Sequence, residues 1–492
     1  MAIQFTGLAS GLDTQSIIRD LMKVERTRVV TVEKDKILAE WRKEAWSSMN
    51  SKLFSFYKEE LFAFKSAGTY NKKKLTSSNE SMISVNTSSA AIRGSHTIEV
   101  TNMAKGSFLT GEPLVGVTGE TRADEMMTFT DPLDTKNLSI SLDGGVTTQQ
   151  ITIEASDTMA NITSKIKDLG LDLNVSYDSS FNRLFLSSTK TGNGIELQVS
   201  GDEDVLNGLG FITDNRIGTI GNDAKFTYNG TELTSSTNEV VVNGLSFNIL
   251  GEGGTSTISV TQDTDAIYDT VKKFVTKYNE LMLEIDGKVS AGSARAFKPL
   301  TSEEKSAMTE EDVKLWEDKI KVSLLRRDET LTSIMSTMRN TLTLSSGVDT
   351  AGFKYRNLSS LGIITGSYTE KGVLHIEGDE DNSLYSVREN KLRKAIDEDP
   401  DAVMKLFTSL GDKLYDDMNK RMQSSNLSSA LTFFNDKSMD KQIRDFDTKI
   451  SDLELRLSSI EDRYYKQFTA MEQAMQQSNS TSNWLTQQLG GL

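Results

Sequence analysis

The side chains that most often carry enzyme chemistry are scarce in this chain. Its 492 residues include two histidines, His96 and His375, and no cysteine. His96 stands in a strand-like run and His375 in the stretch GVLHIEG, where histidines mostly serve packing or the surface. Two histidines cannot supply a His-rich metal site or a persuasive catalytic triad. The lack of cysteine removes thiol nucleophiles, disulfides and cysteine zinc sites.

The acidic and glycine-containing stretches point to no chemistry either. The groups GDEDV, GDEDN and DEDPD lack the Asp-x-Asp-x-Asp-Gly spacing that arranges carboxylates around calcium, and we interpret them as solvated turns. The chain has no phosphate loop of the form GxxxxGK[ST], and no GxGxxG follows a strand. Two carboxylates suffice for a glycosidase, so a cell-wall hydrolase remains an open alternative. We expect no enzyme, no cofactor and no metal site.

Charge and hydropathy argue against two further classes of partner. Asp and Glu total 70 against 55 Lys and Arg, a net charge of −15 that would repel a phosphate backbone, so nucleic acid is not an expected partner. No stretch approaches the roughly 18 consecutive apolar residues that cross a bilayer, so no membrane insertion is expected. The start MAIQFTGLASGLDTQ has neither the basic opening nor the apolar core of a signal peptide, which on its own indicates the cytoplasm.

A long helical pattern near the N-terminus is the first element that could position a binding surface. It runs from Asp13 to about Phe64, with Asp13 or Thr14 as the expected N-cap and an expected break near Trp41 and Trp46. Its apolar positions recur at spacings of three, four or seven, and they include Ile17, Leu21, Val24, Leu38, Ala45, Met49, Leu53 and Phe56. The pattern predicts a stalk helix with an imperfect apolar stripe.

The C-terminal end carries a more regular heptad pattern. Steps of three and four alternate without a slip from Ile443 to Ala474. A lone amphipathic helix is unstable in water, because its apolar face must be buried on a partner. We predict a coiled-coil seam formed by Ile443, Phe446, Ile450, Leu453, Leu457, Ile460, Tyr464 and Met471. Packing of the same stripe on a compact core is the alternative.

Between the two helical ends, the composition changes at about Leu75. Residues 76–262 are rich in Ser, Thr, Gly and Asn, and they show period-two runs such as HTIEV, QQITIE and STISVTQ that are typical of strands. The stretch DTMANITSKIKDLG has helical spacing instead, and helical periodicity returns after Thr264. We therefore predict an α+β, multidomain fold in which N- and C-terminal helices form a coiled-coil stalk and a β-rich head is inserted between them.

These patterns predict three domains. The head is expected to contain two subdomains, one inserted into the other at about residues 104–222. The expected domains are a terminal stalk with mobile tails (1–45 with 441–492), a helical leg domain (46–75 with 263–440) and the β-rich head (76–262).

The last segment of the chain is uncharged yet contains large apolar side chains. No charged residue follows Glu472, but SNSTSNWLTQQLGGL includes Trp484, Leu485, Leu489 and Leu492. Such a tail can stay unfolded in the monomer and then bury its large side chains in the groove of a partner. An idle, frayed end is the other interpretation. We expect residues 1–12 and 478–492 to be mobile in the monomer.

Longer stretches at both ends carry a family resemblance. They are FTGLASGLDTQSIIRDLM and RYYKQFTAMEQAMQQSNSTSNWLTQQL, supported by VRENKLRKAIDEDPDAVMKLF and by DTMANITSKIKDLGLDLNVSYDSSFNRLFLSS. These stretches resemble the bacterial flagellar filament-capping proteins, also called hook-associated protein 2, and the last is similar to a module shared by flagellar hook and cap proteins. The likeness covers most of the chain and is weakest at about residues 104–136 and 190–222.

The resemblance implies a structural, self-assembling cap at the tip of the flagellar filament. Subunits of such a cap, commonly five, form a plate of β domains with helical legs, beneath which exported flagellin folds and inserts without leaking away. Family members leave the cell through the flagellar export apparatus, so an extracellular location replaces the cytoplasmic expectation. The implied partners are further copies in a homo-oligomer, a pentamer above all, together with flagellin, the hook-filament junction protein and a cytoplasmic export chaperone.

Carried onto this sequence, the resemblance implies contact residues at both ends. The candidates for contact with flagellin or the junction are Leu8, Leu12, Ile17, Leu21, Trp484, Leu485 and Leu489. A secreted oligomeric adhesin or glycan-binding protein is the alternative function. In that case the β-rich head would be the functional part and the stalk would serve only to oligomerise the chain.

Overall fold

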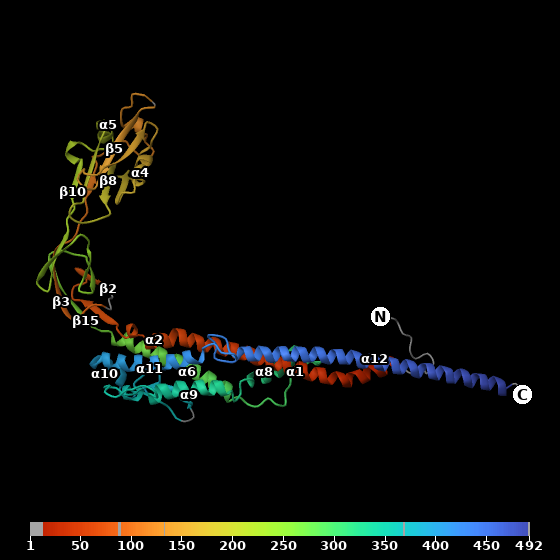
Figure 1. The fold of residues 1–492 in the computed structure, drawn as a ribbon. Helices are drawn as coiled ribbons and strands as arrows, with labels where there is room; N and C mark the ends of the chain where they lie inside the picture. Colours follow the sequence, from red (N-terminus) through yellow and green to blue (C-terminus); the bar gives the residue numbers. More distant parts are fainter. Residues whose placement is uncertain (1–12, 87–89, 132, 368–369, 491–492) are drawn as a thin grey trace. The chain divides into compact units, whose positions relative to one another are not determined.

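The structure, a computed structural model, describes residues 13–86, 90–131, 133–367 and 370–490. The chain divides into two compact units. Unit 1 combines the N-terminal part up to Tyr70 with everything from Thr264 onward, and unit 2 is the segment Asn71–Asp263. Long terminal helices in contact, with β-sheets in between, confirm the predicted α+β class (Figure 1).

Unit 1 is mainly helical. Its described helices begin with one of the two longest, α1, and end with the other, α12, and a short antiparallel hairpin of β16 and β17 lies among them. The elements are α1 (Thr14–Ser55), a π-helix η1 (Phe56–Leu61), α2 (Phe62–Lys65), η2 (Ala67–Thr69), α6 (Thr264–Val289), α7 (Ser302–Ser306), α8 (Glu310–Val322), α9 (Glu329–Leu344), η4 (Leu358–Leu361), β16 (Ile363–Thr365), β17 (Leu374–Ile376), α10 (Lys391–Glu398), α11 (Pro400–Arg421) and α12 (Asp436–Leu489).

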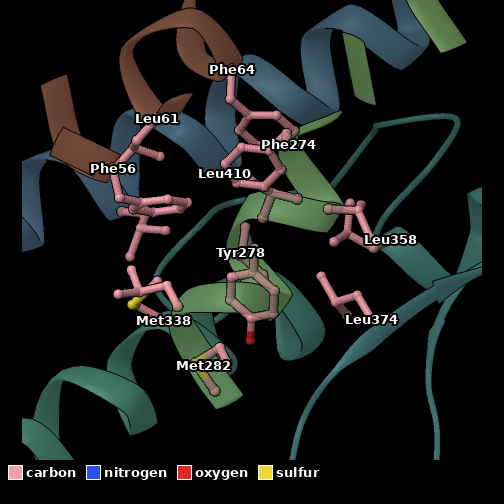
Figure 2. Close-up of a cluster of buried hydrophobic side chains, with 14 of the residues drawn as sticks. Phe56, Leu61, Phe64, Phe274, Tyr278, Met282, Met338, Leu358, Leu374 and Leu410 are labelled. Carbon is pink, nitrogen blue, oxygen red and sulfur yellow. The ribbon is translucent and has the colours of Figure 1, made fainter. Parts of the chain in front are cut away.

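The core of unit 1 is rich in aromatic side chains. Figure 2 shows Phe64, Phe274 and Tyr278 among leucines and methionines that come from distant parts of the chain. The rings of Phe64 and Phe274 stack with their centroids 3.8 Å apart. Burial raises the pKa of the Tyr278 hydroxyl, which donates a hydrogen bond of 3.2 Å to the carbonyl of Gly372. This core ties α2, α6, α9 and α11 to the hairpin.

The helix α1 begins where the sequence predicts but does not break there. Asp13 is the N-cap, and its carboxylate accepts a hydrogen bond of 3.0 Å from the backbone N–H of Ser16. The expected break near Trp41 and Trp46 is wrong, because α1 runs unbroken to Ser55. The regular α-helix changes only at the π-helix η1, whose wider turn places Phe56 and Leu61, five residues apart, both in the core (Figure 2).

The first and last long helices pack side by side and antiparallel. Lys36 of α1 pairs with Asp447 of α12 at 2.7 Å, and Lys43, seven residues later in α1, pairs with Asp440, seven residues earlier in α12. The partners run in opposite directions along the chain, so the two helices are antiparallel. Figure 1 shows α12 continuing beyond the start of α1.

Unit 2 consists of antiparallel sheets. Its four sheets have the strand orders β1-β15-β3-β11-β12, β10-β9-β5-β6, β13-β14-β2 and β4-β8-β7. The strands are β1 (Lys73–Ser77), β2 (Ile83–Asn86), β3 (Gly94–Asn102), β4 (Phe108–Thr110), β5 (Thr135–Ser141), β6 (Gln149–Glu154), β7 (Leu173–Asp178), β8 (Arg183–Ser188), β9 (Glu196–Gly201), β10 (Ile217–Ile220), β11 (Ala224–Tyr228), β12 (Thr231–Ser235), β13 (Glu239–Val242), β14 (Leu245–Ile249) and β15 (Gly254–Gln262).

Unit 2 has two separate hydrophobic cores. One is built from residues between Leu109 and Phe211, and the other from residues on both sides of that stretch. The described part of unit 2 also contains the short α-helices α3 (Ala123–Met126), α4 (Met159–Lys167) and α5 (Glu203–Gly208) and the 3-10 helix η3 (Thr213–Asn215). The expected insertion at about 104–222 spans the first core, while the domain boundaries themselves stay predictions. In the described parts of the chain, no helix is both long and apolar enough to cross a membrane.

We predict that a fragment of residues 71–263 folds alone, because its sheets and both cores are internal to it. The shorter fragment 76–262, which follows the boundary expected from composition, should melt at a lower temperature. It removes Lys73–Leu75, which pair with Val260–Gln262 in β15. Circular dichroism with thermal melting tests both. A disordered spectrum for residues 71–263, or equal melting of the two fragments, would contradict the prediction.

Candidate functional site

Both histidines serve structural contacts. His96 in β3 is buried, with Nε2 2.9 Å from the carbonyl oxygen of Ile92 and Nδ1 2.9 Å from the hydroxyl of Tyr228. His375 in β17 pairs through Nε2 with Glu370 and stacks on Tyr385 at 4.5 Å. The hydrogen bond from His375 is the largest cause that lowers the pKa of Glu370. Neither ring is therefore set up for acid–base chemistry on a substrate.

Metal binding finds no support in the described parts of the chain. No group of three or more His, Asp or Glu side chains there is arranged to hold a metal ion. The surface that remains as a candidate site is the stalk formed by α1 and α12.

The root of the stalk is built around Trp46. Its side chain is 2% exposed, its Nε1 donates a hydrogen bond of 3.0 Å to Asp328, and its ring stacks on Phe434 at 5.4 Å. Asp328 also accepts bonds of 3.0 and 3.2 Å from the backbone N–H groups of Thr330 and Leu331, so it caps α9. Because Phe434 lies two residues before the first residue of α12, this one indole joins α1, α9 and the start of α12.

The predicted seam of α12 lies along its contact with α1. Between residues 441 and 464 seven side chains are half-buried and all others are exposed. The half-buried ones are Ile443, Phe446, Ile450, Leu453, Leu457, Ile460 and Tyr464, whereas Met471, the last predicted seam residue, is exposed. No residue of α12 is fully buried. In a single chain, the seam residues of α12 are therefore only partly shielded from solvent.

The apolar stripe expected on α1 is wrong in its N-terminal half. The apolar side chains buried there are Ile18, Met22, Val29 and Val32, whereas Ile17, Leu21 and Val24 are exposed. Adjacent apolar pairs such as Ile17–Ile18 and Leu21–Met22 allow two different apolar faces on the helix. The buried face is the one that contains the second residue of each pair. The spacing of four, seven and three in Ile18, Met22, Val29 and Val32 was the signal that could have identified it. Two candidate contact residues, Ile17 and Leu21, thus lie on the outside of the stalk.

The tip of α12 extends beyond the start of α1. The pairing of Lys36 with Asp447 and of Lys43 with Asp440 places Thr14 beside about Thr469. From there α12 continues to Leu489, with every side chain from Gln473 onward exposed.

This tip carries three of the candidate contact residues. Trp484 is 58% exposed, Leu489 is 70% exposed, and Leu485 is exposed as well. Residues 478–489 are helical rather than unfolded, since neither Gly nor Pro interrupts the helix before Gly490. The mobility expected for residues 478–492 stays a prediction. The other two candidates, Leu8 and Leu12, lie outside the described residues, as does Leu492.

Two family models match this sequence, and together they cover most of the chain. The family model for the flagellar hook-associated protein 2 C-terminus matches residues 221–480, and the one for the N-terminus matches residues 10–107. The C-terminal match alone spans more than half of the chain. The chain belongs to the flagellar hook-associated protein 2 family.

Individual relatives agree with this assignment. A flagellar hook-associated protein 2 of Halalkalibacterium halodurans is 27% identical, over 96% of this chain and 97% of that protein. The one of Escherichia coli K12 is 24% identical over 99% and 98%. The fold is similar to the crystal structure of the D1-D2-D3 domains of the E. coli flagellar cap protein, with a TM-score of 0.52, 22% identity, and coverage of 76% of this chain and 95% of that one.

Membership of the flagellar hook-associated protein 2 family confirms the resemblance stated from the sequence. It makes this chain a structural, non-enzymatic protein of the flagellar cap, located outside the cell at the tip of the filament. The exposed stalk and its tip are therefore considered as surfaces for protein partners.

We predict that Trp46→Ala destabilises unit 1 by about 3–5 kcal/mol, because a fully packed indole and its hydrogen bond to Asp328 are lost together. Trp484→Ala is the matched control, since that side chain is exposed and its loss should change stability by no more than about 0.5 kcal/mol. Urea unfolding followed by far-UV circular dichroism gives both values. Equal midpoints for the two variants would contradict the assignment of Trp46 as the root.

Proposed function

We propose that this chain forms a self-assembling cap that promotes the folding and polymerisation of flagellin and prevents flagellin from leaking away. The observation that carries the proposal is the tip of α12, a helix that projects past α1, carries no charge after Glu472, and exposes Trp484, Leu485 and Leu489. Exposed apolar side chains of this size favour burial against a protein partner. Absence of charge lowers the desolvation cost of that burial.

The stalk suits a role as a leg that docks with other chains. Its seam is only half-buried in the single chain, and the α1 face with Ile17, Leu21 and Val24 remains exposed. Both features leave apolar surface that further copies or filament subunits can cover. The partners that we propose are further copies of this chain in a pentamer, flagellin, the hook-filament junction protein and, before export, a cytoplasmic chaperone.

The first test separates export from assembly with Leu453→Asp plus Leu457→Asp. Two carboxylates would then face α1 in the seam, where a poorly solvated charge without a partner is costly, so the two helices should separate. Cells should still secrete the protein, because unit 2 keeps its cores and export is proposed to depend on the N-terminal region. We expect short filaments or none, with unpolymerised flagellin in the medium, measured by electron microscopy and immunoblotting.

The matched control places the same two charges on the outer face of α12. Leu455 is 68% exposed and Ser458 is exposed too, so Leu455→Asp plus Ser458→Asp should leave filament length close to that of the unmodified strain. Normal motility in the seam variant would show that the α1–α12 contact does not support capping. A loss of surface attachment with normal filaments, in variants of the head, would instead favour the adhesin.

The second test concerns the tip. Replacing Trp484, Leu485 and Leu489 by Ser should abolish motility while leaving the melting curve of the purified protein unchanged, because these side chains are exposed and contribute little to the monomer. Val115, Leu133 and Val146 of unit 2 are also exposed and give a triple Ser control. Swimming halos in soft agar measure the effect. A tip variant that swims like the control would remove the tip from the list of partner contacts.

A further inference from the structure

Residues 290–327 of unit 1, between α6 and α9, form a segment that we name the arm. The first and last residues of the arm lie next to each other. The backbone N–H of Arg327 donates a hydrogen bond of 2.9 Å to the carbonyl of Val289. The side chain of Arg326 donates another of 2.9 Å to the carbonyl of Ala291. These bonds close the base of the arm, so its two ends are held together as the two sides of one hinge.

The arm has a small core of its own. The rings of Phe297 and Trp316 meet edge to face at 4.7 Å, and the indole N–H of Trp316 donates a bond of 2.8 Å to the carbonyl of Lys298. Leu300 and Ile320 are buried without belonging to the main core. Of the described residues of the arm, Leu325 alone is part of the unit 1 core. Between its roots the arm thus has ring and hydrogen-bond contacts within itself, and Leu325 is the residue that it shares with the core of unit 1.

Charged side chains hold the arm on α1. Lys34 of α1 donates to both carboxylate oxygens of Glu304, at 2.7 and 2.9 Å. Lys321 of the arm lies over the ring of Trp41, with its ammonium 4.8 Å from the ring centroid. Among the described residues, these are the ion pair and the ring contact that join the arm to α1. The Lys34 side chain is 15% exposed and Glu304 47%, so the ion pair is within reach of solvent ions.

Beneath the arm lies a groove with an apolar wall. Its volume is about 390 Å³, and it lies between α1, α6 and α8. Its apolar lining consists of Trp41, Ala45 and Met49 of α1 and of Val322 and Leu324 of the arm. The lining also includes the charged residues Glu44, Glu284, Lys288, Asp318 and Lys321. The α1 residues of this groove lie next to Trp46, the root of the stalk. The position of the arm thus decides whether this part of α1 is covered.

We propose that the arm is an electrostatic strap that closes over the Trp41 face of α1 and opens as a unit about its roots when its charged contacts are lost. The closed state is held by Lys34–Glu304 and by Lys321 on Trp41, contacts that weaken when salt screens them. The hinge bonds and the internal core do not depend on those charges. Opening therefore uncovers the indole of Trp41 and the apolar wall beside it without unfolding unit 1.

The absence of cysteine allows a direct test on the full-length chain. Spin labels on Arg28→Cys in α1 and Glu311→Cys in the arm, both exposed positions, report the distance between the arm and α1 by double electron–electron resonance. We expect a single narrow distribution at low salt and a longer, broader one at about 1 M salt, where the screening length falls to about 3 Å. Lys34→Glu should give the long, broad distribution already at low salt.

Two further variants separate the ion pair from general effects. Lys34→Glu combined with Glu304→Lys should restore the short distance, although the second change also removes the capping box between Thr301 and Glu304. Arg26→Glu makes the same charge change at an exposed position of α1 and should leave the distribution unchanged. A narrow, unchanged distribution in Lys34→Glu and at high salt would overturn the strap. Equal lengthening in Arg26→Glu would overturn it as well.

Discussion

The contact of one indole with one carboxylate determines how the stalk is attached. Trp46 belongs to α1 and Asp328 caps α9. Phe434, which stacks on Trp46, lies two residues before the start of α12. A buried carboxylate is costly unless charge and hydrogen bonds compensate it. Asp328 has both, since Arg42 lies 3.1 Å away and three N–H groups donate to it. Separating α1 from α9 would leave this carboxylate poorly compensated, and moving the start of α12 would remove the stacking of Phe434 on Trp46.

The rest of the stalk is held much less firmly than its root. No side chain of α12 is fully buried, and two positions of α1 that face α12 are the lysines Lys36 and Lys43. Exposed ion pairs of this kind contribute about 0.2–1 kcal/mol each. The firm packing therefore lies at the root, and the apolar surface left uncovered increases toward the tip. Such a gradient suits a leg whose tip gains its packing from a partner while its root keeps a fixed position in unit 1.

Much of this fold could be predicted from the sequence because the signals are local. The heptad of α12 alternates steps of three and four without a slip, Asp13 is a recognisable N-cap, and strand-like runs identify unit 2. The sequence could not show which face of α1 is buried, because the pairs Ile17–Ile18 and Leu21–Met22 place an apolar residue on either face. The tail looked unfolded because it lacks charge, yet only Gly490 stops the helix.

Features that rest on distant partners could not be predicted. Trp46 contacts Asp328 and Phe434, which are hundreds of positions away in the chain, and nothing near Trp46 distinguishes it from the more exposed Trp41. The π-helix has no local signal either, because its wide turn follows from the packing of Phe56 and Leu61 in the core. At the candidate site, the sequence indicated apolar residues near both ends of the chain. It did not show which of these side chains are exposed on the stalk.

The root also explains how two helices with repetitive sequences keep one register. If α12 slid by one heptad, Lys36 would face Glu454 and Lys43 would face Asp447, so both ion pairs would be kept. The heptad stripe would stay in phase as well, and the seam alone cannot prevent the slip. The root does prevent it, because a shift of about 10 Å would separate Phe434 from Trp46. It would also break the hydrogen bond of 2.8 Å from the backbone N–H of Phe433 to the Asn50 side chain. The length by which the tip of α12 projects beyond α1 is thus fixed at the opposite end of the stalk.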